Sequence, residues 1–281
     1  VFFSGVDGNV ANITIQNGNE LTGHGGGIYA TGALSMTRVG ILNSVAQLAG
    51  GGAFATDAVT VNEGLFERNR AVTYDGGGLY GNSSVTLAGT RFVGNKAQTS
   101  GGGARAQGSV SLTGGTFEGN SAGNQGGGLY AYMSLALTNT SFVANTAGSG
   151  GGVYHYGGVF LNSESALVVN ALFARNTAQT NGAAVYFDHP SSADVIHTTV
   201  ASPTIASASA FFVGSGTIQI ANTIVASHTT GFNRGIGTVL EDYTLFDAVP
   251  IPRGSGVLAG GHSFPGTAAF ANTAADTFHR T

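Results

Sequence analysis

The sequence predicts an all-β protein: a single parallel β-solenoid with about 25 residues per coil and roughly ten or eleven coils. Three observations support this fold. A glycine-rich pentad recurs at nearly constant intervals, a Phe-x-x-Asn motif recurs in phase with it, and the residues between them alternate with a period of two. Short strands of this kind cannot bury an apolar face alone, so the repeats must stack on one another.

The pentad reads Gly-Gly-Gly, an apolar residue, then an aromatic residue or arginine. It begins at Gly25, Gly50, Gly76, Gly101, Gly126 and Gly150, in steps of 25, 26, 25, 25 and 24 residues. A weaker copy, 182–186, follows after 32 residues, so this coil carries an insertion of about seven residues, near 157–165. Glycine tolerates positive φ and close backbone approach, which predicts a sharp corner at each pentad.

The second marker predicts an internal ladder of amides. Its asparagines are Asn69, Asn95, Asn120, Asn145 and Asn176. Stacked coils place these side chains one above another, where they can hydrogen-bond along the axis and to the turn backbone. The phenylalanine of each motif is expected to fill the interior beside them.

One domain, residues 1–281, accounts for the whole pattern. Residues 1–24 read as a degenerate first coil, 25–186 as regular repeats, and 187–281 as less regular C-terminal coils. In that last part, 193–202, 217–227 and 240–247 still have strand character. The chain opens at Val1 within strand-like sequence, which we read as a processed protein or a segment of a longer one.

Alternation within the pentad predicts which side chains face outward. The fourth position is always apolar and therefore points inward, so the fifth position and the residue two further on point outward. These outward positions in successive coils predict one outer face, made of Tyr29, Phe54, Tyr80, Arg105, Tyr130, Tyr132, Tyr154, Tyr156, Tyr186 and Asp188. Arg105 is expected between two tyrosine rings, in cation–π range.

This face has two interpretations. In one, the rings only stabilise neighbouring coils, or are covered by a loop or partner. In the other, Tyr130, Tyr132, Tyr154 and Tyr156 form an exposed two-by-two binding platform, rimmed by loops 157–165 and 188–192.

Composition excludes several classes of protein. Charged residues make up 9% of the chain, the net charge is −4, and Lys96 is the sole lysine, which argues against a nucleic-acid partner. The absence of cysteine excludes cysteine catalysis and zinc–thiolate sites. No apolar run is long enough for a transmembrane helix.

The combination of Gly-Gly-Ala/Ile/Leu/Val with Phe-x-x-Asn resembles the repeats of polymorphic outer membrane proteins. The stretches 220–225, 242–246 and 268–276 resemble the tail of bacterial secreted β-helix proteins that end in a variable anchor. The first resemblance implies a right-handed parallel β-helix. Together they imply export, an extracellular or bacterial cell-surface location, and an adhesive or structural role.

Catalytic motifs are sparse. Gly23-His24-Gly25 matches the Gly-His-Gly of polygalacturonases, but the paired carboxylates that such hydrolysis needs do not accompany it. Asp188, His189, Asp194 and His197 could hold a metal, although scattered loop polarity explains them better. We therefore expect no catalytic residues, no metal and no cofactor.

The main hypothesis is a non-enzymatic, exported adhesive or structural module that associates with itself, end to end into a fibre or laterally, or with a surface glycan. The alternative is a β-helix that binds or cleaves polysaccharide, as a lyase or glycoside hydrolase, through its tyrosine-rich face.

Overall fold

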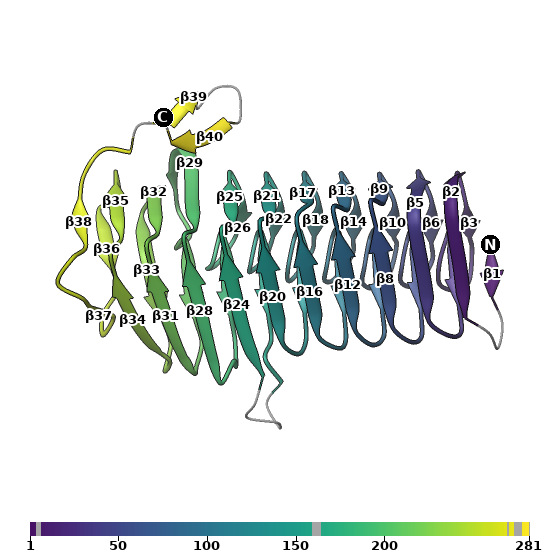
Figure 1. The fold of residues 1–281 in the computed structure, drawn as a ribbon, viewed down its shortest axis with the longest axis horizontal. Helices are drawn as coiled ribbons and strands as arrows, with labels where there is room; N and C mark the ends of the chain where they lie inside the picture. Colours follow the sequence, from purple (N-terminus) through teal and green to yellow (C-terminus); the bar gives the residue numbers. More distant parts are fainter. Residues whose placement is uncertain (4–6, 159–163, 269, 273–276, 281) are drawn as a thin grey trace.

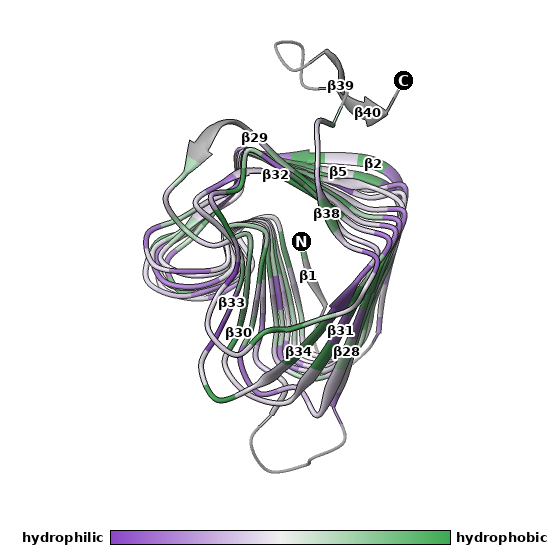
Figure 2. Cartoon of the chain, turned by 90° about the vertical axis from the view of Figure 1, so that its left-hand side faces the viewer, coloured by the Kyte–Doolittle hydropathy of each residue, from purple (hydrophilic) through white to green (hydrophobic). Residues whose placement is uncertain are grey.

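A computed structural model describes residues 1–3, 7–158, 164–268, 270–272 and 277–280. The regular structure of these residues is β-strand, and all strands except the last two belong to three parallel sheets that run along one axis (Figure 1). Viewed along that axis, successive coils superimpose around a common interior (Figure 2). The predicted β-solenoid is therefore confirmed.

The first sheet has one short strand per coil and contains the pentads. Its eleven strands agree with the ten or eleven coils predicted. In spatial order they are β1 (Phe2–Phe3), β4 (Ile28–Ala30), β7 (Ala53–Ala55), β11 (Leu79–Gly81), β15 (Ala104–Ala106), β19 (Leu129–Ala131), β23 (Val153–His155), β27 (Val185–Phe187), β30 (Phe211–Val213), β33 (Thr230–Arg234) and β36 (Ile251–Arg253).

The second sheet has twenty strands in two ranks that meet at a corner. The first rank is β2 (Gly8–Gln16), β5 (Leu34–Leu42), β8 (Val59–Asn62), β12 (Val85–Ala88), β16 (Val110–Thr113), β20 (Leu135–Thr138), β24 (Ser165–Val169), β28 (Ser192–Ile196), β31 (Thr217–Ala221), β34 (Thr238–Asp242) and β37 (Leu258–Ala259). The second rank is β9 (Leu65–Glu67), β13 (Arg91–Val93), β17 (Thr116–Glu118), β21 (Ser141–Val143), β25 (Leu172–Ala174), β29 (Thr199–Ala206), β32 (Ile224–His228), β35 (Leu245–Asp247) and β38 (Phe264–Pro265).

The third sheet closes the coil before the chain turns back to the next pentad. Its strands are β3 (Asn19–Glu20), β6 (Val45–Ala46), β10 (Arg70–Ala71), β14 (Lys96–Ala97), β18 (Ser121–Ala122), β22 (Thr146–Ala147) and β26 (Thr177–Ala178). The strands expected within 193–202, 217–227 and 240–247 are all present, in the second sheet. Strand β2 pairs with β5 in register, so the degenerate first coil is confirmed as well.

Packing inside the coil follows the predicted alternation. The fourth residue of each pentad is buried, as Leu129 and Val153 show. The motif phenylalanines stack at the interior, with ring centroids 4.6 Å apart for Phe92 and Phe117. A Cβ on Gly150, where φ is +63°, would lie 2.5 Å from the Val153 carbonyl oxygen, which explains the need for glycine at this corner.

The asparagine ladder forms as predicted. The Nδ2 atom of Asn95 donates to Oδ1 of Asn120 at 2.9 Å and to the carbonyl oxygen of Phe66 at 2.9 Å. The same pattern links Asn69, Asn95, Asn120, Asn145 and Asn176. Because these amides are buried, each bond satisfies a polar group that water cannot reach.

The described residues after 268 do not continue the coils. Strands β39 (Phe270–Asn272) and β40 (Thr277–Arg280) form an antiparallel pair outside the three parallel sheets (Figure 1). The expectation of coils over 187–281 is therefore wrong for this last segment, because its strands pair with each other instead of with the preceding coil. Within the described residues no helix has the length and hydrophobicity needed to cross a membrane.

Candidate functional site

The outward residues of the pentads form one continuous stack along the first sheet, which we call the aromatic column. Its members are Tyr29, Phe54, Tyr80, Arg105, Tyr130, Tyr154, Tyr186 and Phe212. Adjacent ring centroids lie 5.0 Å apart for Phe54 and Tyr80 and 4.9 Å apart for Tyr154 and Tyr186. The column is a direct result of placing the same residue type at the same position in successive coils.

Sequence reasoning did not include Phe212. Its ring lies 4.6 Å from that of Tyr186 and extends the column by one coil. The signal was available: Phe212 follows Tyr186 by 26 residues, and 208–212 reads as a further degenerate pentad without glycine.

Arg105 occupies the column as predicted. Its guanidinium lies 5.7 Å from the ring centroid of Tyr80 and 4.6 Å from that of Tyr130. Sequence reasoning missed its ion partner: Nη1 of Arg105 donates to Oδ2 of Asp75 at 2.6 Å, and Nη2 donates to Gln107. An arginine in this half-buried stack is tolerated because its charge is paired.

The column is not the exposed platform that the alternation suggested. Tyr130 is only 6% exposed and Tyr154 only 4%. The turn that enters each pentad packs against the base of the ring; a Cβ on Gly150 would lie 2.9 Å from the Cβ of Tyr154. The prediction of an exposed four-ring patch is therefore wrong for these two tyrosines. Their rings instead stabilise the stacking of neighbouring coils.

Burial also determines the chemistry of these hydroxyl groups. The Tyr154 hydroxyl donates to Oδ2 of Asp188 at 2.6 Å. Desolvation raises the pKa of Tyr130 and, together with the bond to Asp188, raises the pKa of Tyr154 well above its usual range. Both tyrosines therefore remain neutral at physiological pH.

Tyr132 and Tyr156 are the accessible part of the predicted platform. Both are half-buried, and their ring centroids lie 4.8 Å apart. The His189 ring meets Tyr156 edge-on at 5.4 Å, and its Nδ1 lies 3.3 Å from Oδ1 of Asp188. Residues 188–192 thus border this pair, whereas residues 159–163 of the other predicted loop lie outside the described part of the chain.

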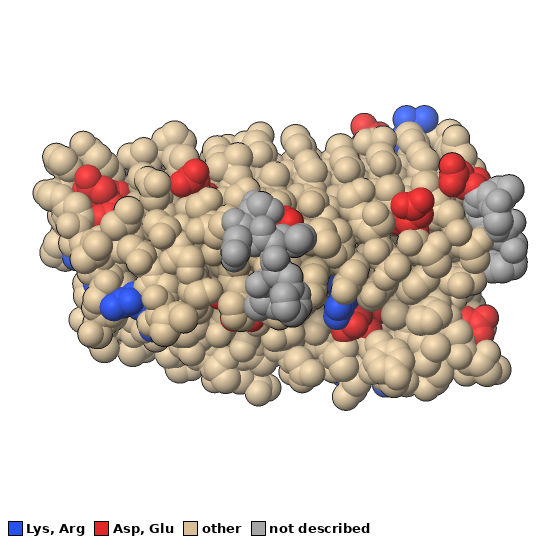
Figure 3. Space-filling model, turned by 90° about the horizontal axis from the view of Figure 1, so that it is seen from below, with Lys and Arg blue, Asp and Glu red and all other residues tan. Residues whose placement is uncertain are grey.

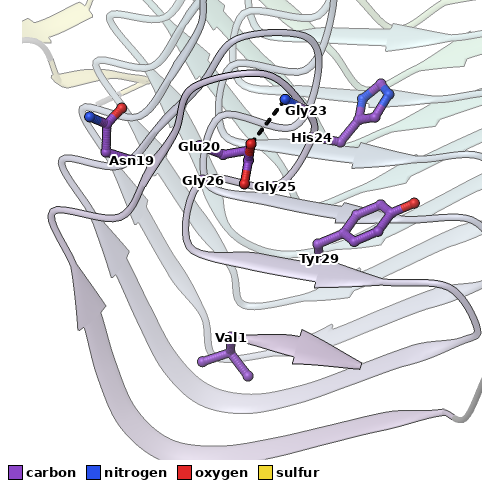
Figure 4. A pocket seen from close by; sticks show the side chains of 8 residues that line it. All are labelled: Val1, Asn19, Glu20, Gly23, His24, Gly25, Gly26 and Tyr29. Carbon is purple, nitrogen blue, oxygen red and sulfur yellow. Dashed lines mark hydrogen bonds between the residues drawn. The ribbon is translucent and has the colours of Figure 1, made fainter. Parts of the chain in front are cut away.

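The aromatic column begins beside a hollow at the first coil (Figure 4). The hollow has a volume of about 440 Å³, and His24, Tyr29 and Glu20 are among its lining residues. The His24 ring lies 4.3 Å from Phe54, and its Nδ1 accepts a hydrogen bond from the Ala49 amide at 3.3 Å. Partial burial lowers the pKa of His24. The histidine of the Gly-His-Gly motif therefore packs against the column.

Of the four residues considered for a metal, Asp188 and His189 lie against each other, but they do not gather with the other two. Asp188 bonds to Tyr154, and His197 lies on the corner of the second sheet, where its Nε2 is 3.3 Å from Nδ2 of Asn222. In the part of the chain that is described, no three His, Cys, Asp or Glu side chains gather as a metal site. Figure 3 shows charged side chains scattered over the lower face, with no large patch of one sign.

His155 and Glu241 are two of the titratable side chains that are buried in the described part of the chain. His155 is fully buried, and its Nε2 donates to the Met133 carbonyl oxygen at 2.7 Å. Burial lowers the pKa of His155 to about 4. Glu241 is also buried and pairs with Arg253 at 2.5 Å. Nothing in the repeat pattern pointed to this ion pair.

Comparison with known families gives one match. Residues 114–132 match the Chlamydia polymorphic membrane protein repeat, a segment that runs from the start of β17 through β19 and Tyr132. Neither the curated proteins nor the solved structures include a significant match to the chain. The matched repeat indicates a β-helix of a bacterial outer membrane or cell surface. The protein is thus a parallel β-solenoid, and one segment of it is similar to the repeat of polymorphic membrane proteins.

Proposed function

We propose that the protein is a non-enzymatic surface module that serves as an adhesive or structural rod outside a bacterial cell. The observation that carries this proposal is that the recurring side chains connect one coil to the next. The aromatic column connects eight successive coils, and the asparagine ladder connects five of them. Such repetition produces a stiff, extended body, which suits display of a binding surface away from a membrane.

The acidic side chains support a role without catalysis. Asp75 pairs with Arg105, Asp188 accepts from Tyr154, and Glu241 pairs with Arg253. A glycosidase needs two carboxylates on either side of a substrate, and a calcium-dependent lyase needs several oxygen ligands in one place. Carboxylates that are engaged by their own neighbours are poorly suited to either reaction.

An adhesion assay tests the proposal. Beads coated with the protein should attach to cultured cells or to immobilised cell-surface material above the level of albumin-coated beads. Equal attachment would refute the adhesive role. In parallel, incubation with polygalacturonate, with and without calcium, should release neither unsaturated nor new reducing ends. Release of such ends by the wild type but not by His24→Ala would show that the protein is an enzyme.

End-to-end assembly is a second candidate, favoured by exposed apolar residues in the last coil. Ile251, Leu258 and Phe264 are each about half exposed on β36, β37 and β38. Terminal strands with apolar side chains can template another chain. Sedimentation velocity over a range of concentrations distinguishes a monomeric rod from a growing fibre.

A further inference from the structure

A row of polar and aromatic side chains follows the corner between the two ranks of the second sheet. We call it the corner row: Asn139, Asn170, His197, Asn222, Tyr243 and His262. All six side chains are exposed. In the two preceding coils the same position holds Gly89 and Gly114, so the row of side chains begins abruptly at Asn139.

The corner row is one wall of a groove that runs parallel to the solenoid axis. Two adjoining hollows form it, with volumes of about 300 Å³ and about 440 Å³. Both are lined by His197, which joins them into one groove along the C-terminal half of the rod. The floor consists of outward residues from the second rank, and Leu172, Thr199, Ile224 and Leu245 lie there in register.

Hydrogen bonds between neighbouring side chains hold the corner row in place and leave some of its donors and acceptors available. Nδ2 of Asn170 donates to Oδ1 of Asn139 at 2.6 Å, and Nδ2 of Asn222 meets Nε2 of His197 at 3.3 Å. An asparagine side chain can make four hydrogen bonds, so each amide retains donors and acceptors for a ligand. The Tyr243 and His262 rings stack at 4.4 Å and add apolar surface.

The row also retains a side chain where the backbone favours none. Tyr243 has a φ of +55°, in the left-handed region that bulky residues rarely adopt. Glycine at this position in other coils shows that the turn itself needs no side chain. Asn12, Arg38 and Glu63 adopt the same left-handed conformation at this corner in the first coils, so the kind of side chain, and not the backbone, distinguishes the groove.

Electrostatics decides which ligand fits. Among the residues that line the two hollows there is no lysine, arginine, aspartate or glutamate. Asp242, next to the wall, is already paired: its Oδ2 lies 3.0 Å from Nδ1 of His262, a hydrogen bond that lowers the pKa of Asp242. A nucleic acid or an acidic polysaccharide would find no cation here.

The backbone argues against an extended peptide as the ligand. Peptides commonly bind by adding a strand to a free sheet edge. Along most of the groove the strands, such as β25 and β29, pair with neighbours on both sides, and only β38 at its end presents an edge, too short for an extended peptide. Amides, imidazoles and aromatic edges above a short apolar floor instead match a chain of hydroxyl-rich rings with apolar faces.

We propose that the groove between the corner row and the second rank binds an extended, neutral polysaccharide. This inference rests on the adhesive role proposed above and gives it a ligand class and a site. It places that site away from the aromatic column, whose rings are engaged in coil stacking.

The test removes the wall while preserving the turn. A triple variant, Asn170→Gly, His197→Gly and Tyr243→Gly, places glycine at three corner positions. Glycine already occupies this corner in two other coils, at Gly89 and Gly114. Asn12→Gly is the matched control, because Asn12 has a φ of +57° and lies on the same corner outside the groove. Probes are maltohexaose, cellohexaose, dextran, polygalacturonate and a synthetic extended peptide, followed by calorimetry and by tyrosine fluorescence, since the protein lacks tryptophan.

At least one neutral glycan should bind the wild type and the Asn12→Gly control equally, and the triple variant at least about tenfold more weakly. Thermal melts should be similar for all three proteins. Absence of binding to every neutral probe, equal binding by the triple variant, or binding to polygalacturonate or peptide alone would overturn the inference. If beads coated with the triple variant still adhere to cells, the groove is wrong while the adhesive role stands; if the wild type fails to adhere, the adhesive role itself is wrong.

Discussion

Nε of Arg253 donates to Oε2 of Glu241 at 2.5 Å, inside the last coils of the solenoid. The Glu241 side chain is fully buried and occupies the register that Ile220 fills one coil earlier, while Arg253 follows Phe232 in the first sheet. The Arg253 guanidinium also lies 5.0 Å from the Phe246 ring. The interior of the last coils therefore contains an ion pair, which another copy of the chain would have to cover if the stack continued.

The first prediction concerns this pair. Glu241→Leu should lower the free energy of unfolding by about 3 kcal/mol, because it leaves Arg253 without its partner in a largely apolar site. Adding Arg253→Leu should restore part of the loss and, by making the end apolar, promote concentration-dependent association. Urea melts and sedimentation velocity measure the two effects. A double variant that is monomeric and no more stable than Glu241→Leu would show that the pair does not cap the solenoid.

The second prediction concerns the asparagine ladder. Asn120 makes four buried hydrogen bonds, to the Asn95 amide and side chain, to Phe92 and to Asn145. Asn120→Ala should cost ~1–3 kcal/mol in urea melts, because its partners lose their hydrogen bonds out of reach of water. Asn82→Ala, at an exposed position, should change stability by no more than ~0.5 kcal/mol. Equal losses would contradict the inward register of the ladder.

The third prediction separates the buried from the accessible tyrosines. Tyr130→Ala and Tyr154→Ala should each destabilise the protein by about 3–5 kcal/mol, because each leaves a cavity in the aromatic column. Tyr132→Ala and Tyr156→Ala should each cost about 1 kcal/mol, the value of a partly exposed ring pair. Thermal melts of the four variants measure this. If all four lose the same amount, the turn does not bury the column as described.

The fourth prediction concerns acid. His155 is neutral in the folded protein down to pH about 4, whereas the unfolded chain takes up this proton near pH 6.5. Stability from His155 is thus fully present above pH 6.5 and is lost as the pH falls towards 4, by about 3 kcal/mol. His155→Ala, the residue found at this register in the preceding coil as Ala131, should flatten the dependence over that range.

Urea melts at pH 7, 5.5 and 4.5 compare the two proteins. Some acid sensitivity should persist in the variant, because burial also lowers the pKa of His228. An unchanged slope in His155→Ala would mean that His155 does not control acid unfolding.

Much of the fold could be predicted from residues that recur at fixed positions. The pentads determined the coil length, and Asn95 and Asn120 bond as their spacing required, because parallel in-register stacking places equal positions one above another. Arg105 between Tyr80 and Tyr130 followed from the same rule.

The tertiary structure decided what covers the outside of each coil. Alternation along a strand establishes whether a side chain points in or out, but it does not encode that Tyr154 is buried between the Tyr130 and Tyr186 rings with its hydroxyl bonded to Asp188. Asp75 meets Arg105 from 30 residues away, and Glu241 meets Arg253 across the interior. The corner row lies at the turn between the two ranks of the second sheet, outside the pentad and the Phe-x-x-Asn motif, so neither motif pointed to it. The sequence alone therefore determined the period and the interior of this protein, whereas chain paths between strands, which depend on packing of distant segments, decided its surfaces.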